Sequence, residues 1–130
     1  MLLDASAIIA FLLKEEGGAE VLNVVGSRPC FVSSVTLTEV QGKLIGRGAF
    51  TPKQVQAHLD PLLGLAREVV FDADCREAAV FYYARKSPYD LSLGDAACLG
   101  TAEVLKVDVL TAEQNWAKIP DLPFNVRLIR

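Results

Sequence analysis

Short apolar segments alternate with helical segments along the whole chain, and this alternation restricts the possible folds more than any other feature of the sequence. Strands separated by helices pair in parallel, with the helices packed on both faces of the sheet. The sequence therefore predicts a three-layer α/β/α fold around a central, mainly parallel sheet of about five strands. The predicted strands are residues 1–3, 30–34, 67–71, 107–111 and 126–130.

The helical segments between these strands have ends that the sequence marks. Thr51 is expected to cap one helix, because a proline follows it at the first helical position. Pro61 is expected to kink or interrupt that helix, and Gly26 to end an earlier one. Val40 and Leu44 lie one turn apart and should face the core together. The predicted helices are residues 6–13, 17–27, 35–48, 51–65, 72–86, 92–106 and 112–118.

Composition limits the class of protein. The chain has 130 residues, of which 52% are apolar, and this suits one domain over residues 1–130. Because 13 basic residues stand against 16 acidic ones, a broad basic face for duplex nucleic acid is not indicated. Three distant cysteines and one histidine predict neither a disulfide framework nor a zinc site, and they favour the reducing cytoplasm. We expect no signal peptide and no membrane helix. The positive mean hydropathy suggests that a partner covers some apolar surface.

Asp4 stands directly after the first predicted strand, between two apolar segments. A carboxylate buried there is costly unless something pairs with it, so Asp4 needs a partner. Glu113 follows the fourth predicted strand by two residues. In open parallel sheets, ligands bind beyond the carboxyl ends of the strands, where the strand order reverses. Both acids are therefore expected at that edge of the sheet.

Two further acids, Glu39 and Asp95, lie near the starts of predicted helices and allow two readings. Thr36-x-x-Glu39 and Ser92-x-x-Asp95 both match a capping box, in which the acid bonds back to the backbone amide of the cap residue. On that reading the two acids are structural only. Capping explains Asp4 less readily, and it does not readily explain the recurrence of acids at corresponding edges of several strand–helix units.

The other reading is that the four acids converge on a metal ion. Several carboxylates within a few ångströms raise one another's pKa and stay ionised together only when a cation neutralises them. Mg²⁺ or Mn²⁺ suits such a site, because hard divalent ions prefer oxygen ligands and retain water. The ion would activate water and offset charge on a scissile phosphate. Ser6 and Thr111 are candidates to hold a ligand carboxylate or a metal-bound water, or are ordinary helix caps.

Four stretches resemble, in order and spacing, the four acidic motifs of PIN-domain nucleases, and more specifically those of the VapC toxins of bacterial toxin–antitoxin modules: "LLDASAIIAFLL", "VSSVTLTEV", "LSLGDAACLGTA" and "VLTAEQNW". The resemblance covers nearly the whole chain. It implies a Mg²⁺- or Mn²⁺-dependent endoribonuclease, often a homodimer, which a VapB antitoxin inhibits by occupying the groove beside the acids. Asp4, Glu39 and Asp95 match the family's first three catalytic, metal-binding acids. Glu113 stands where the family usually has aspartate.

Glu113 and two basic residues leave alternatives open. Glutamate is longer than aspartate by one bond, about 1 Å of reach, so Glu113 is expected to serve as a secondary ligand. Lys43 and Arg47 share a helix face with Glu39, either as an exposed ion-pair face or as contacts that draw RNA in. The nearest alternative is a PIN domain that has lost its chemistry and binds only RNA or protein. A phosphoacceptor signalling domain and a dimeric scaffold, with the acids serving only as caps, are alternatives from other classes.

Overall fold

Five strands form one fully parallel sheet in the computed structural model, which describes residues 1–130. The strands are β1 (Leu2–Leu3), β2 (Cys30–Ser33), β3 (Ala66–Val69), β4 (Val109–Thr111) and β5 (Val126–Leu128). Their order across the sheet is β3-β2-β1-β4-β5, so that β1 lies at the centre between β2 and β4. The predicted fold, with five parallel strands, is confirmed.

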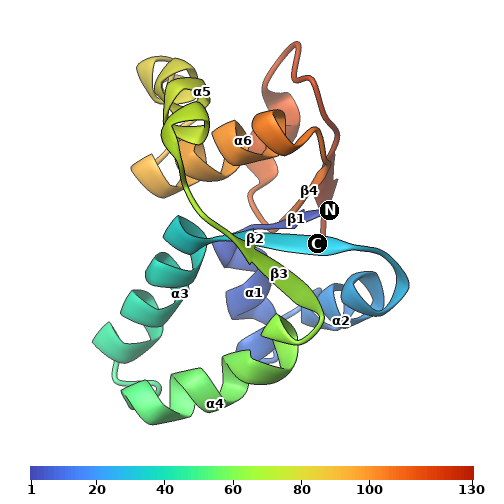
Figure 1. Ribbon diagram of the computed structural model, residues 1–130, viewed down its shortest axis with the longest axis vertical. Helices are drawn as coiled ribbons and strands as arrows, with labels where there is room; N and C mark the ends of the chain where they lie inside the picture. Colours follow the sequence, from blue (N-terminus) through green and yellow to red (C-terminus); the bar gives the residue numbers. More distant parts are fainter.

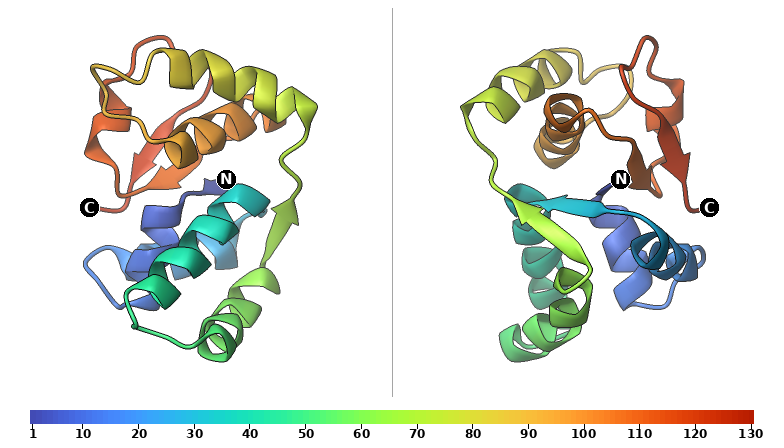
Figure 2. Two further views of the ribbon diagram at one scale, coloured as in Figure 1. Left: turned by 90° about the vertical axis from the view of Figure 1, so that its left-hand side faces the viewer. Right: turned by 45° about the vertical axis from the view of Figure 1, so that its right-hand side comes forward.

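Six helices cover the two faces of this sheet and complete three layers (Figure 1). Four of them pack on one face: α1 (Ala5–Leu12), α2 (Gly18–Ser27), α3 (Ser34–Gly46) and α4 (Pro52–Leu63). The other face carries α5 (Ala73–Ala84) and α6 (Leu93–Leu105), followed after β4 by the short 3-10 helix η1 (Gln114–Lys118). Both views in Figure 2 show the sheet between these two groups of helices.

The order of the strands explains why the helices divide in this way. From β1 through β2 to β3 the chain moves outward in one direction, and the connection through α5 and α6 then returns across the sheet to β4. Connections between parallel strands are right-handed in nearly all proteins, so a reversal of direction moves the connecting helices to the opposite face. The reversal leaves a switch point between β1 and β4, whose carboxyl ends lie side by side.

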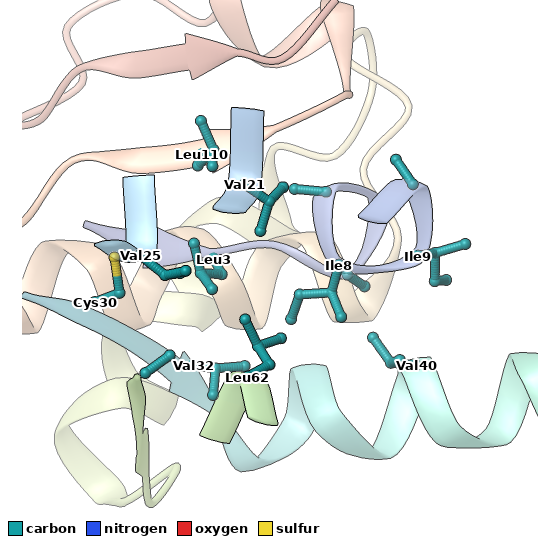
Figure 3. Close-up of a cluster of buried hydrophobic side chains, with 14 of the residues drawn as sticks. Leu3, Ile8, Ile9, Val21, Val25, Cys30, Val32, Val40, Leu62 and Leu110 are labelled. Carbon is teal, nitrogen blue, oxygen red and sulfur yellow. The ribbon is translucent and has the colours of Figure 1, made fainter. Parts of the chain in front are cut away.

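The core lies on both faces of the sheet, because the central strands are covered on each side. Leu3 of β1 packs with Ile8, Val32 and Leu62 on the face of α1 to α4 (Figure 3). Its neighbour Leu2 points to the face of α5 and α6. Both leucines are fully buried, as the alternation of side chains along a strand requires. A strand of two residues is thus sufficient to join the two halves of the core.

The predicted start of α4 is confirmed, whereas α2 and α4 continue past the residues expected to end or interrupt them. Thr51 caps α4 in a capping box with Gln54, and Pro52 stands at the first helical position. Gly26, however, lies inside α2, which continues to Ser27. Pro61 also lies inside its helix, because α4 extends to Leu63. The other α4 residues Val55, Leu59 and Leu62 are buried, and this packing outweighs the hydrogen bond that a proline cannot donate. Val40 and Leu44 are fully buried, as predicted.

Two further features concern the cysteines and the lengths of the apolar helices. Cys30, Cys75 and Cys98 are buried free thiols. None of the helices combines the length and the apolar character that a bilayer crossing requires.

Candidate active site

One pocket brings together all four acids that the sequence singled out. It has a volume of about 320 Å³ and lies at the switch point of the sheet. Lys43 is the only basic residue that lines it. We call this hollow the acidic pocket, and its lining residues are Asp4, Ala5, Ser6, Glu39, Lys43, Ser92, Asp95 and Glu113.

Each acid reaches the acidic pocket from a different element. Asp4 joins β1 to α1, and Glu113 follows β4 by two residues, so the neighbouring strands deliver these two. Asp95 lies in the first turn of α6, and Glu39 lies one turn further along α3. The amino-terminal ends of α1 and α6 carry partial positive charge, which favours the carboxylates placed there.

Asp4 is the cap residue of α1, although capping was not expected to explain it, and its partners are neutral donors rather than a basic side chain. It is only 2% exposed, and its Oδ2 accepts from Ser6 N at 3.2 Å, Ser6 Oγ at 2.6 Å and Thr111 Oγ1 at 2.8 Å. Its Oδ1 accepts no hydrogen bond, yet no buried side-chain oxygen lacks a partner, so Oδ1 must face the acidic pocket. Burial raises the pKa of Asp4 to about 6, against the opposing effect of the bonds from Ser6 and Thr111.

The hydroxyls of Ser6 and Thr111 connect the two sides of the switch point by hydrogen bonds. Ser6 Oγ accepts from Ala112 N at 2.9 Å, and Thr111 Oγ1 accepts from Glu113 N at 3.0 Å. Since each hydroxyl donates its proton to Asp4, each one links a backbone amide beyond β4 to the carboxylate beyond β1. This network fixes the direction in which Asp4 presents its free oxygen.

Replacing Thr111 by valine is expected to raise the pKa of Asp4 further, by about 1, because a bond that favours the charged carboxylate is removed. The pKa is measured from the pH dependence of the carboxyl ¹³C resonance of Asp4. Thr101→Val is the matched control, since the Thr101 hydroxyl is equally buried but donates to the carbonyl of Ala97. An Asp4 titration that is the same in both variants would contradict the role assigned to Thr111.

Glu39 does not belong to a capping box, so of the two readings left open for this acid the capping reading is wrong. Helix α3 begins at Ser34 and is capped by Ser33, whose Oγ accepts from Val35 N at 3.2 Å. The carboxylate of Glu39 instead pairs with Lys43, with Oε1 2.9 Å from Nζ. This contact raises the pKa of Lys43. Arg47 is exposed at the end of α3 and does not line the acidic pocket.

Asp95 is both a capping residue and a pocket residue. Its backbone amide donates to Ser92 Oγ at 3.0 Å, and its Oδ2 accepts from Ser92 N at 2.9 Å. The predicted capping box is therefore present. Burial raises the pKa of Asp95, the bonds from Ser92 oppose that rise, and the charge of Glu39 adds to it. The two readings of this acid are compatible.

Glu113 precedes η1, but its side chain makes no capping hydrogen bond. Burial raises the pKa of Glu113, and the charges of Asp95 and Glu39 raise it further. Glu113 lines the acidic pocket together with the other three acids, where Lys43 is the only basic residue.

The donor set of the acidic pocket suits a hard divalent cation. All four acids offer oxygen, and Asp4 presents an oxygen without a hydrogen bond. No three acidic, cysteine or histidine side chains converge closely enough to enclose an ion. Mg²⁺ and Mn²⁺ do not require such a cage, because Mg²⁺ commonly keeps several waters and uses one or two carboxylates. The residues therefore fit an ion that water helps to coordinate.

Sequence reasoning did not single out Gly94, which lies beside Glu39 in the structure. The only signal was a glycine inside the first turn of a helix, where glycine is unfavourable.

Comparison with known proteins agrees with the fold. VapBC2 from Rickettsia felis bound to a DNA fragment from their promoter contains a chain with a TM-score of 0.73 and 16% identity, covering 98% of this chain and 96% of that one. A chain of DNA-bound VapBC from Salmonella typhimurium has a TM-score of 0.73 and 19% identity, over 99% and 97%. A chain of a toxin–antitoxin complex from Klebsiella pneumoniae has a TM-score of 0.72 and 22% identity, covering 99% of this chain and 97% of that one. At these identities the likeness establishes the fold.

The sequence itself identifies the family. A search of curated proteins gave no match. The PIN domain family, in contrast, matches residues 1–122, which include all four acids and every strand but β5. The chain belongs to the PIN domain family.

Proposed function

We propose that this chain is a Mg²⁺- or Mn²⁺-dependent endoribonuclease of the VapC type, the toxin of a toxin–antitoxin pair. PIN domains are generally nucleases, and this chain belongs to that family. The observation that carries the proposal is the acidic pocket itself, which four carboxylates from separate elements line at the switch point of the sheet. A protein that used these acids only as helix caps would not require Glu39 or Glu113 there.

The four acids would hold the ion in different ways. Asp4 and Asp95 would hold the ion directly, with Glu39 and Glu113 as further ligands, directly or through water; all four line the acidic pocket. When bound, the ion supplies an activated water and offsets charge on the scissile phosphate. Ser6 and Thr111 keep the Asp4 carboxylate in its orientation.

Two basic residues are candidates for RNA contact. Lys43 lines the acidic pocket beside Glu39, where its ammonium group can meet a phosphate oxygen. Arg47 lies further along α3, outside the pocket, where it would meet RNA that extends beyond the cleaved bond.

A VapB-type antitoxin is the proposed partner, and a homodimer the proposed assembly. The similar solved structures include VapBC complexes, which supports a protein partner of that class. An apolar hollow of about 550 Å³ between α1, α2 and α4 supports it too, because Phe11, Leu12 and the 53% exposed Leu22 lie there. The three free thiols agree with a reducing cytoplasm as the place of action.

The test is cleavage of total bacterial RNA by the purified chain in Mg²⁺, Mn²⁺ or EDTA, with the new 5′ ends mapped. Asp95→Asn should lower the cleavage rate at least 100-fold, since it removes a ligand charge, while its amide oxygen can still accept from the Ser92 amide. Asp90→Asn is the matched control, because Asp90 is an exposed loop residue outside the acidic pocket.

Discrete cuts that need the metal, persist in Asp90→Asn and disappear in Asp95→Asn would support the nuclease. Folded protein that binds RNA but never cuts it would overturn the proposal in favour of a binding-only PIN domain. In that case, Glu113→Asp, which restores the residue usual in the family, would show whether the longer side chain is responsible.

A further inference from the structure

Gly94 lies against the carboxylate of Glu39. A Cβ atom built on residue 94 would stand 2.6 Å from Oε2 of Glu39 and 3.1 Å from its carboxyl carbon. Cβ atoms in proteins essentially never approach other heavy atoms as closely as 2.6 Å, so a side chain at position 94 would make the Glu39 carboxylate, the far end of a flexible side chain, shift from this position. The space that Glu39 fills exists because residue 94 has no side chain.

Backbone conformation does not explain this glycine. Gly94 does not have the positive φ that Gly17 and Gly48 have, and it lies inside the first turn of α6. At such a position alanine is more favourable than glycine, by up to about 1 kcal/mol in a helix interior. The close approach of the Glu39 carboxylate is the contact that a side chain at position 94 would disturb.

The opposite oxygen of Glu39 is held as well. Oε1 pairs with Nζ of Lys43 at 2.9 Å, whereas Oε2 lies towards Gly94. The carboxylate therefore sits between a lysine of its own helix and the first turn of α6. Asp95 is the next residue of that turn, and its side chain lines the same pocket as Glu39.

We propose that Gly94 is a positioning residue, which admits the Glu39 carboxylate to the acidic pocket beside Asp95 and so makes it available to a divalent cation. The part of the inference that concerns the cation rests on the proposed function. The placement of Glu39 by Gly94 does not.

Two measurements on Gly94→Ala test the inference. The crystal structure of the variant should show the Glu39 carboxylate moved out of the acidic pocket with α6 unchanged. The affinity of the variant for Mn²⁺, with no RNA present, should fall about tenfold. It is measured from the decrease of the free-ion signal in electron paramagnetic resonance. Gly42→Ala is the matched control, because Gly42 lies on the same helix as Glu39 and a Cβ there would meet nothing within 4 Å.

A double-mutant cycle with Glu39→Gln shows whether Gly94 acts through Glu39. In the Glu39→Gln background, Gly94→Ala should weaken Mn²⁺ binding no further. An equal loss with and without Glu39→Gln, or a Glu39 carboxylate that stays in place in the crystal structure, would overturn the inference. A wild-type chain that binds no Mn²⁺ would contradict the proposed function instead, and the crystal structure would still decide the role of Gly94.

Discussion

Replacing Asp4 by asparagine is expected to stabilise the protein by about 3 kcal/mol at pH 7 in EDTA, although the same change should abolish RNA cleavage. Burial raises the pKa of Asp4 from 3.8 to about 6. The folded protein therefore holds this proton more tightly than the unfolded chain does, so its free energy of unfolding falls as the pH rises from about 4 to about 6. Above that range, the wild type carries the full cost of the buried charge, about 1.4 kcal/mol for each unit by which the pKa is raised.

Asparagine avoids this cost with little change in packing. Its Oδ1 can accept the bonds that Oδ2 of Asp4 accepts from Ser6 and Thr111, and its amide nitrogen then takes the place of the free oxygen that faces the acidic pocket. The increase in stability should therefore depend on pH. It should be near zero at pH 4 and reach its full value above pH 6.

Urea unfolding of both proteins from pH 4 to pH 8 measures this difference. Asp60→Asn is the control, because Asp60 is an exposed carboxylate on α4, and its replacement should change the unfolding free energy little at any pH. If Asp4→Asn were less stable than the wild type at pH 7, the buried charge of Asp4 would not lower the free energy of unfolding as the raised pKa indicates.

Replacing Gly100 by alanine is expected to lower the free energy of unfolding by about 3 kcal/mol. A Cβ atom on Gly100 of α6 would stand 2.5 Å from the backbone nitrogen of Ala79 and 2.7 Å from its Cα. Both are backbone atoms of α5, so the two helices would have to separate. Thermal and urea unfolding of the variant and the wild type measure this loss of unfolding free energy.

Gly26→Ala provides the comparison, since Gly26 is an exposed residue inside α2 with no atom within 4 Å of its would-be Cβ. This variant should gain up to about 1 kcal/mol from the better helix propensity of alanine. Equal stability of the two variants would mean that α5 and α6 can separate without penalty, contrary to the close packing seen here.

The fold was predictable because the evidence for it is local. The three central strand segments are apolar enough to be buried, and the helices between the strands leave parallel pairing as the simplest arrangement. The errors lie at ends where packing decides. Pro61 remains helical because its neighbours on α4 are buried, and α3 starts two residues before Thr36 because Ser33 provides the cap.

The four acids of the candidate site were predictable for a similar reason. Asp4 and Glu113 follow strands, and the carboxyl ends of neighbouring parallel strands meet at one edge. The contact between Glu39 and Gly94 was not predictable, because it depends on how closely α3 and α6 approach. The free oxygen of Asp4 depends in the same way on hydroxyls from two separate segments.

The central claim is that the acidic pocket binds a divalent cation through Asp4, and calorimetry of Mn²⁺ binding at pH 6 tests it most directly. Because burial raises the pKa of Asp4 to about 6, about half of the molecules carry its proton at that pH, and binding must release it. Titrations in two buffers of different ionisation enthalpy should therefore show release of about half a proton or more per ion. Asp4→Asn should bind at least tenfold more weakly and release fewer protons. Absence of binding, or binding with the same affinity and proton release in both proteins, would contradict the claim.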